Sequence, residues 1–317
     1  MIKKYIRRVK RSFFKVLIWA KKISIPGFDG IPLYDVMVFF YKAIADGTLT
    51  NRASAIAFNF FMAFFPSLIF LFTLIPYIPI ENFQAELFRL IRDVLPESTF
   101  TVVEETLFDI LMRPRGSLLS LGFFMALVFS SNGLVSMMNA FDASMHTIAK
   151  RNLIDQRINS FLLLFIMFIL VTVSIVLIIT GQGAIDILYS HDLLGSRLNY
   201  YLVIIAKWLV ILFLLFFAFS SLYFFAPAKK TRWRFISPGS TLTTILSILV
   251  LSGFRYYIAH FGRYNKVYGS IGTLLVVLML FYLMSLILLV GFELNNSLNA
   301  AKHSGKQILK RPKRLTS

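Results

Sequence analysis

The sequence contains no cysteine among its 317 residues, which excludes disulfides, thiolate-bound metals and thiol redox chemistry. Charged residues are also scarce, since Asp, Glu, Lys and Arg make up 15% of the chain, whereas a soluble domain normally has about 25%. Hydrophobic residues make up 57% of the chain, and 34 of them are phenylalanines. This balance predicts a polytopic membrane protein rather than a soluble globular domain.

The sequence signatures of several enzyme classes are missing as well. There is no phosphate-binding glycine-rich loop, no G-x-S-x-G and no H-E-x-x-H. The four histidines are far apart in the sequence, and none has a carboxylate at metal-ligand spacing. The carboxylates of the predicted cytoplasmic side are scattered, whereas two-metal nuclease chemistry needs them to converge. The sequence therefore predicts no enzyme, no cofactor and no metal site.

Long apolar stretches are what the sequence has in abundance. Six of them approach the roughly 20 residues that a helix needs to cross the bilayer core. They lie at about 53–78, 118–141, 158–180, 201–225, 237–261 and 269–296. The last one carries no charged residue from Leu274 to Val290 and ends at Glu293. We therefore predict an all-α integral membrane protein, with a six-transmembrane-helix bundle formed by residues 51–298.

The segments between and around these stretches are more polar. Residues 1–50 predict a basic cytoplasmic or interfacial arm, because the Lys/Arg cluster before residue 25 is typical of an amphipathic helix on anionic lipid. Residues 33–46 predict a second interfacial helix. Residues 79–117 hold seven acids and four arginines and predict an extracytoplasmic helical hairpin. We expect loops at 142–157, 181–200 and 262–267, and a basic cytoplasmic tail at 299–317.

The net charge of +18 is concentrated in particular segments. Six spans place the arm up to Arg52, the 142–157 loop, the 227–235 turn and the tail on one face. These segments hold 24 of the 33 Lys and Arg residues and, with Glu293, six of the 15 acids. Cytoplasmic segments carry such an excess of cations, so we expect both termini in the cytoplasm. We expect the cationic segments to interact with the anionic headgroups of membrane lipids, and we expect no specific nucleic acid as a partner.

Three stretches carry a resemblance to a known family. They are Arg52-Ala-Ser-Ala-Ile-Ala-Phe with Phe65-Pro66, then Asn139-Ala-Phe141, and then Phe261-Gly-Arg-Tyr-Asn through Tyr268-Gly-Ser-Ile-Gly272 to Gly291-Phe-Glu-Leu-Asn295. From about residue 40 to 300 the chain resembles the YihY / virulence factor BrkB membrane proteins, once labelled ribonuclease BN. The resemblance implies six helices in a bacterial inner membrane. It implies no settled activity, although members are associated with serum resistance and envelope function, and a transport role is commonly suspected.

Candidate helix-pairing or cavity residues are Arg52, Asn59, Pro66, Asn132, Asn139, Tyr268, Gly269, Gly272 and Glu293. Arg52 begins the first span and Glu293 ends the last, where a carboxylate is costly unless it is paired or hydrated. We expect a salt bridge between them, and the alternative is that each faces water, with Arg52 bound to a lipid phosphate. Pro66 removes one backbone hydrogen bond from the first span, so a kink or packed irregularity is expected there.

Asn59, Asn132 and Asn139 lie deepest in apolar surroundings, where they either bond between helices or line a cavity. The second and fifth spans are interrupted by small polar residues. Three helices in each half give the two halves opposite orientations, which is compatible with an inverted repeat and a midplane site between these two spans. The leading hypothesis is transport or export of a lipidic or amphipathic envelope compound. The alternatives are a non-transporting scaffold or envelope-integrity factor and, third, a ribonuclease, for which these residues give no support.

Overall fold

The computed structural model describes residues 30–45, 47–79, 83–94, 104–105, 108–145, 152–190, 197–229, 236–260 and 262–310. Within these ranges the chain is 92% helical and contains no strand, which confirms the predicted all-α membrane fold. The elements are α2 (Leu33–Ala45), α3 (Thr48–Leu74) with the 3-10 turn η1 (Ile75–Tyr77), α4 (Phe83–Val94), α6 (Gly116–Ser144), α7 (Leu153–Ser190), α8 (Arg197–Phe225), α9 (Pro238–His260) and α10 (Gly262–Lys310).

Five stretches of the described helices are long and apolar enough to cross a membrane. They are Thr48–Tyr77, Gly116–Ser144, Leu153–Leu177, Val203–Phe225 and Leu274–Lys302. α9 corresponds to the remaining predicted span and is 23 residues long, but Ser, Thr and Gly dilute its first half. Five of the predicted spans therefore coincide with apolar helices, whereas α9, at the span predicted for 237–261, is rich in hydroxyl side chains.

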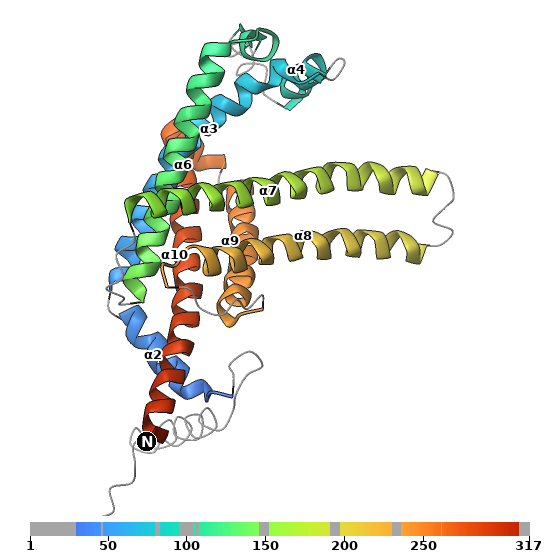
Figure 1. The fold of residues 1–317 in the computed structure, drawn as a ribbon. Helices are drawn as coiled ribbons and strands as arrows, with labels where there is room; N and C mark the ends of the chain where they lie inside the picture. Colours follow the sequence, from blue (N-terminus) through green and yellow to red (C-terminus); the bar gives the residue numbers. More distant parts are fainter. Residues whose placement is uncertain are drawn as a thin grey trace, which may run out of the picture.

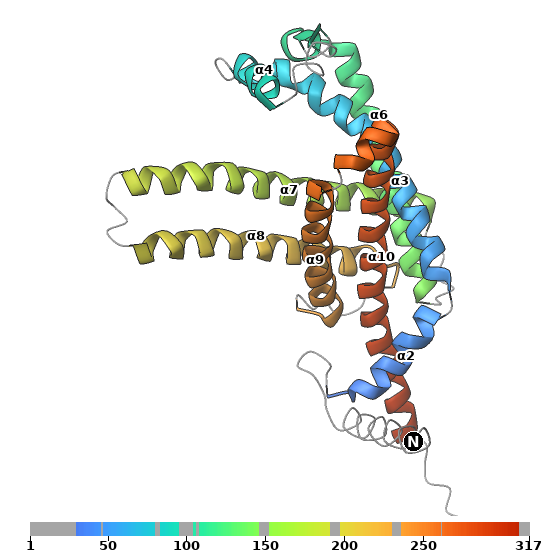
Figure 2. The same ribbon diagram turned by 180° about the vertical axis from the view of Figure 1, so that it is seen from behind.

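The helices run in two directions. α3, α6, α9 and α10 lie roughly along one another, and α7 and α8 form an antiparallel hairpin that crosses them (Figures 1 and 2). α10 is central, because it contacts α2, α3, α6 and α9. α2 and the C-terminal part of α10 form one end of the molecule, and α4 lies at the other. The crosswise hairpin departs from a simple bundle of side-by-side spans, because hydropathy specifies that a helix is apolar and not the direction in which it runs.

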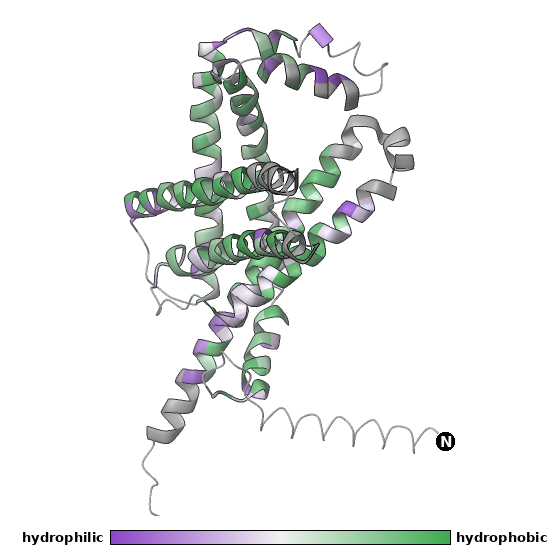
Figure 3. Ribbon diagram, turned by 90° about the vertical axis from the view of Figure 1, so that its right-hand side faces the viewer, coloured by the Kyte–Doolittle hydropathy of each residue, from purple (hydrophilic) through white to green (hydrophobic). Residues whose placement is uncertain are grey.

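Hydrophilic and apolar residues occupy different parts of this arrangement. Apolar residues cover the α7–α8 hairpin and the long helices, whereas hydrophilic residues gather around α4 and along the far end of α10 beside α2 (Figure 3). Many large apolar side chains of the hairpin are exposed, among them Phe165, Phe168 and Phe213. Such contiguous apolar surface is what lipid solvates and water does not.

The hydrophobic core lies where α3, α6, α8 and α10 converge. Phe141 stacks on Phe292 with ring centroids 4.0 Å apart, and Tyr223 packs against both rings. Ile56 and Leu289 are almost completely buried around this aromatic group. Since aromatic pairs contribute about 0.5–1.5 kcal/mol beyond their buried area, this group helps to fix how the helices meet.

A close helix crossing holds α9 against α10. A Cβ placed on Gly291 would overlap the hydroxyl of Thr243, and one placed on Gly239 would overlap the carbonyl oxygen of Gly291. The Tyr223 hydroxyl, which also contacts the Thr243 hydroxyl, donates to the Leu288 carbonyl oxygen at 2.8 Å. Only glycine permits this approach of the two backbones, so the crossing depends on these two positions.

Several predicted boundaries were wrong. α7 begins at Leu153 and continues to Ser190, so the predicted loops at 142–157 and 181–200 are partly helical. α10 runs from Gly262 to Lys310, and this helix replaces the predicted 262–267 loop and most of the predicted tail. The reason is that isolated glycines cost a helix only about 1 kcal/mol each and no proline interrupts either segment.

Other predicted segments are described only in part. The second interfacial helix corresponds to α2, and α3 continues without interruption through Pro66. Of the predicted 79–117 hairpin, α4 and residues 108–112 are helical. The predicted amphipathic helix before residue 25 lies outside the described residues.

Candidate functional site

A polar pocket of about 340 Å³ lies between α2, α3, α6 and α10. Its polar lining includes Lys42, Thr48, Arg52, Ser144, Glu293 and Asn296. α2 contributes Lys42 together with the apolar side chains of Phe39 and Ala43. Both members of the predicted ion pair therefore line one pocket.

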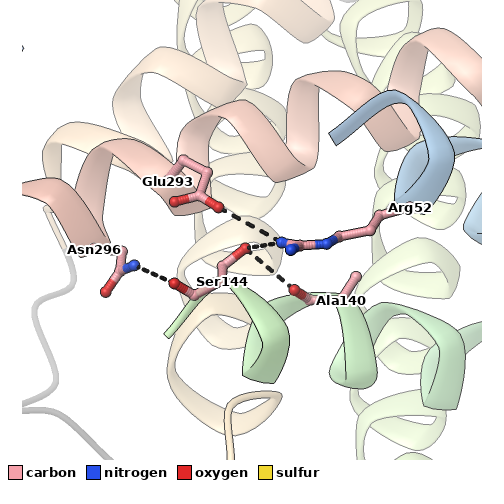
Figure 4. Close-up of polar contacts among 5 residues, drawn as sticks. All are labelled: Arg52, Ala140, Ser144, Glu293 and Asn296. Carbon is pink, nitrogen blue, oxygen red and sulfur yellow. Dashed lines mark hydrogen bonds and ion pairs between the residues drawn. The ribbon is translucent and has the colours of Figure 1, made fainter. Parts of the chain in front are cut away.

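Four residues of the pocket lining, Arg52, Ser144, Glu293 and Asn296, are joined by a small polar network (Figure 4). Arg52 Nη1 lies 3.9 Å from Glu293 Oε1, so the predicted salt bridge between the first and last spans is present. The same nitrogen donates to Ser144 Oγ at 2.9 Å, and Ser144 Oγ donates to the Ala140 carbonyl oxygen at 3.2 Å. Asn296 Nδ2 donates to the Ser144 carbonyl oxygen at 2.8 Å. The network thus connects α3, α6 and α10.

Local sequence explains why these groups meet. Gly47 has φ of 69°, a conformation that glycine adopts readily, and it joins α2 to α3 in a tight turn just before Arg52. Ser144 is the last residue of α6, so its carbonyl has no partner within the helix and accepts the Asn296 amide instead. Glu293 and Asn296 are three residues apart on α10 and therefore share one helix face.

Glu293 is the buried charge of the pocket. Its side chain is 4% exposed, whereas that of Arg52 is 23% exposed. Arg52 is its one ionic or hydrogen-bonding partner within the described part of the chain, and 3.9 Å is too long for a direct hydrogen bond. The carboxylate therefore keeps acceptor capacity on the pocket side, while the guanidinium keeps unused donors.

Lys42 gives the pocket a second cation. Its side chain is exposed on α2, and it forms no ion pair with any described carboxylate. Among the described residues that line the pocket, two side chains are cationic and one is anionic. The pocket can therefore hold an anion beside its cations and accept a hydrogen bond at Glu293.

Two of the three predicted asparagines bond between helices. Arg157 Nη1 donates to Asn132 Oδ1 at 2.7 Å, and Gln156 Nε2 donates to Asn139 Oδ1 at 2.5 Å. Both bonds join α6 to the first turns of α7, so these two residues pair helices and do not line the pocket. Asn59 instead donates to the Ala55 carbonyl oxygen of its own helix at 2.8 Å.

The remaining predicted positions lie apart from the pocket or outside the described side chains. Pro66 is in the interior of α3, and Gly272 is buried in α10. Tyr268 and Gly269 belong to α10, but their side-chain surroundings fall outside the described residues. None of the described positions among these four lines the pocket.

Sequence reasoning missed Ser144, Asn296 and Lys42 as members of the pocket. Ser144 could have been found from its place at the end of a helix, and Asn296 from its spacing to Glu293. A neighbouring asparagine, Asn295, was also missed: its Oδ1 accepts from the Gly239 backbone N–H at 2.8 Å, and its Nδ2 donates to Ser237 Oγ at 3.0 Å. These bonds fasten the start of α9 to α10.

Fold and site together define a polytopic α-helical membrane protein with a charged pocket near one end of its apolar helices. Among the residues that the structure describes, no group of three or more His, Cys, Asp or Glu side chains is placed to hold a metal. The chain belongs to the Virulence factor BrkB family, whose model matches residues 40–316. This match confirms the resemblance seen in the sequence.

Individual relatives agree with this assignment. The chain is 31% identical over 252 residues to the ribonuclease-like protein YfkH of Bacillus subtilis, covering 80% of this chain and 90% of that protein. It is 33% identical over 116 residues to a UPF0761 membrane protein of Vibrio campbellii, covering 37% of this chain and 35% of that protein. No solved structure matches. The family is not a known enzyme family, and the ribonuclease label is not supported.

Proposed function

We propose that the protein transports or exports a lipidic or amphipathic envelope compound that enters through the charged pocket. The observation that carries this proposal is the position of the pocket at the polar end of the apolar spans. Arg52 directly precedes the apolar run of α3, and Glu293 directly follows the uncharged stretch of α10 that ends at Phe292. An amphipathic molecule has its polar group at this depth in a bilayer.

The orientation that we propose places the pocket on the cytoplasmic side of a bacterial inner membrane. The distribution of Lys and Arg supports it, because the cation-rich segments are those that six spans place on one face. α2 and the C-terminal part of α10 lie at the pocket end, and the basic arm and tail continue from them. Both termini and the pocket would then face the cytoplasm.

A non-transporting scaffold is the second candidate, and a different observation favours it. Asn132 and Asn139 are used in bonds between α6 and α7, and Asn295 fastens α9 to α10. Polar groups that would otherwise suggest a transport path therefore hold helices together. A scaffold needs these contacts and does not need an accessible pocket.

The lipid composition of each membrane leaflet, measured with and without the protein, separates the two functions. Transport predicts that one lipid class accumulates in the inner leaflet when the protein is absent, and that the wild-type chain restores its distribution. Glu293→Gln, which keeps the size of the side chain, should restore it less well than a matched change outside the pocket such as Asn59→Ala. Unchanged leaflet compositions, together with loss of envelope integrity, would contradict transport and support the scaffold.

A further inference from the structure

We infer that the pocket binds the phosphodiester headgroup of an anionic, hydroxyl-bearing glycerophospholipid from the leaflet on its own side. This inference rests on the proposed function and names the substrate class for the same site. The phosphate would lie between Lys42 and Arg52, and a headgroup hydroxyl would donate to Glu293.

Charge balance favours a monoanion. The charged side chains that the structure describes in the pocket are Lys42, Arg52 and Glu293, with a net charge of +1. One phosphodiester carries a single negative charge and neutralises this excess, whereas a zwitterionic headgroup would leave it in place. A phosphomonoester with two negative charges would reverse its sign. The charges of the described lining residues therefore favour a ligand with one negative charge.

The donor groups suit a phosphate. Arg52 uses one nitrogen for Ser144, and a guanidinium has five N–H donors in a fork that matches phosphate oxygens. Lys42 adds a flexible ammonium that no described carboxylate neutralises. The Thr48 hydroxyl also lies in the lining. Charge-assisted hydrogen bonds of this kind are roughly twice as strong as neutral ones.

Glu293 adds a requirement that phosphate alone does not meet. A buried carboxylate, 3.9 Å from its cation, needs a hydrogen-bond donor on the pocket side. A headgroup that carries hydroxyl groups beyond the phosphate supplies that donor, whereas one that ends in a methyl group does not. The pocket should therefore distinguish phosphatidylglycerol from phosphatidylmethanol, which have the same charge and differ in these hydroxyls.

α2 carries an exposed apolar stripe on the face opposite its pocket-lining residues Phe39, Lys42 and Ala43. Its Val36 face packs against Leu294 and Leu298 of α10, which fixes the helix at the pocket edge. Met37, Tyr41 and Ile44 follow one another at helical spacing and are exposed, Tyr41 to 72%.

Such a stripe, with a tyrosine among aliphatic side chains, is typical of a helix that lies in the membrane interface. An α2 anchored in the interface by this stripe would hold the pocket at the depth of the lipid headgroups. A free phosphate ester is not concentrated at that depth, whereas a lipid headgroup is.

The test is lipid binding by the purified full-length protein, with phosphatidylglycerol, phosphatidylmethanol and phosphatidylcholine as probes in mixed micelles or nanodiscs. We expect phosphatidylglycerol to bind most tightly and phosphatidylcholine least. Lys42→Gln should weaken phosphatidylglycerol binding about tenfold, which is the loss expected for one charge-assisted contact. Glu293→Gln should reduce the preference over phosphatidylmethanol without weakening anion binding.

Lys229→Gln is the matched control, because Lys229 is an exposed cation in the turn after α8 and outside the pocket lining. It should bind phosphatidylglycerol as the wild type does. Equal losses for Lys42→Gln and Lys229→Gln would overturn the inference, since binding would then follow overall charge. Competition by inorganic phosphate or glycerophosphoglycerol as strong as that by the lipid would also overturn it.

The two proposals fail separately. Headgroup-specific binding without any change in leaflet composition would contradict transport and leave the lipid site standing. A leaflet effect that persists in the Lys42→Gln and Glu293→Gln variants, without any headgroup preference in the wild type, would overturn the site and leave transport standing.

Discussion

The ion pair between Arg52 and Glu293 gives the sharpest prediction about stability. Arg52→Ala removes the one ionic partner that the described residues offer to a carboxylate that is 4% exposed, and it also removes the hydrogen bond to Ser144. Breaking a fully buried pair costs about 3–5 kcal/mol. The 3.9 Å separation and the 23% exposure of Arg52 place this pair below that range, so we expect about 2–3 kcal/mol.

Glu293→Gln should cost less, about 1 kcal/mol, because a neutral amide does not need a cation beside it. Combining it with Arg52→Ala should therefore lose less stability than the sum of the two single changes. The expected coupling is about 1 kcal/mol or more, as found for residues in direct contact.

The assay is unfolding of the detergent-purified protein by heat or denaturant, with the four members of the cycle measured side by side. The reversed pair, Arg52→Glu with Glu293→Arg, is a further member, since the Ser144 hydroxyl can donate to a carboxylate as readily as it accepts from a guanidinium. Additive losses in the cycle, together with no recovery in the reversed pair, would refute the idea that these two charges stabilise each other.

Further predictions concern the helix contacts and the orientation of the chain. Gly291→Ala should destabilise the α9–α10 crossing by about 3 kcal/mol or more in thermal unfolding, whereas Gly253→Ala, with nothing within 4 Å of its Cβ, should be neutral or stabilising. Asn132→Ala removes the acceptor of a bond from α7 and should cost about 1 kcal/mol in the same measurement. Single cysteines at Arg7 and Lys310, in a chain that has no other cysteine, should react with an impermeant reagent from the same side of the membrane; reaction from opposite sides would exclude an even number of crossings.

Part of the site could be predicted from the sequence. Arg52 and Glu293 stand at the edges of uncharged apolar runs, where an unpaired charge is costly, so their pairing followed from position and charge alone. The start of α9 also follows from local sequence, because Ser237-Pro238 combines a capping residue with proline at the first helical position.

The remaining members of the pocket could not be predicted in this way. Arg52 and Ser144 are 92 residues apart, and Ser144 and Asn296 are 152 residues apart. Whether they meet depends on how each helix is rotated and where it crosses its neighbour. Both properties depend on packing between distant helices, such as the stacking of Phe141 of α6 on Phe292 of α10.

The sequence by itself determined that this chain is a membrane protein. It also determined the positions of the apolar helices along the chain and the charged residues at their ends. These properties are local, because the cost of placing a residue in lipid depends mainly on the residue and its near neighbours. The tertiary structure alone decided that α7 and α8 run crosswise, that α10 continues far past its apolar part, and that four separate helices enclose one charged pocket. Those features depend on contacts between distant residues, whose energies no single stretch of sequence contains.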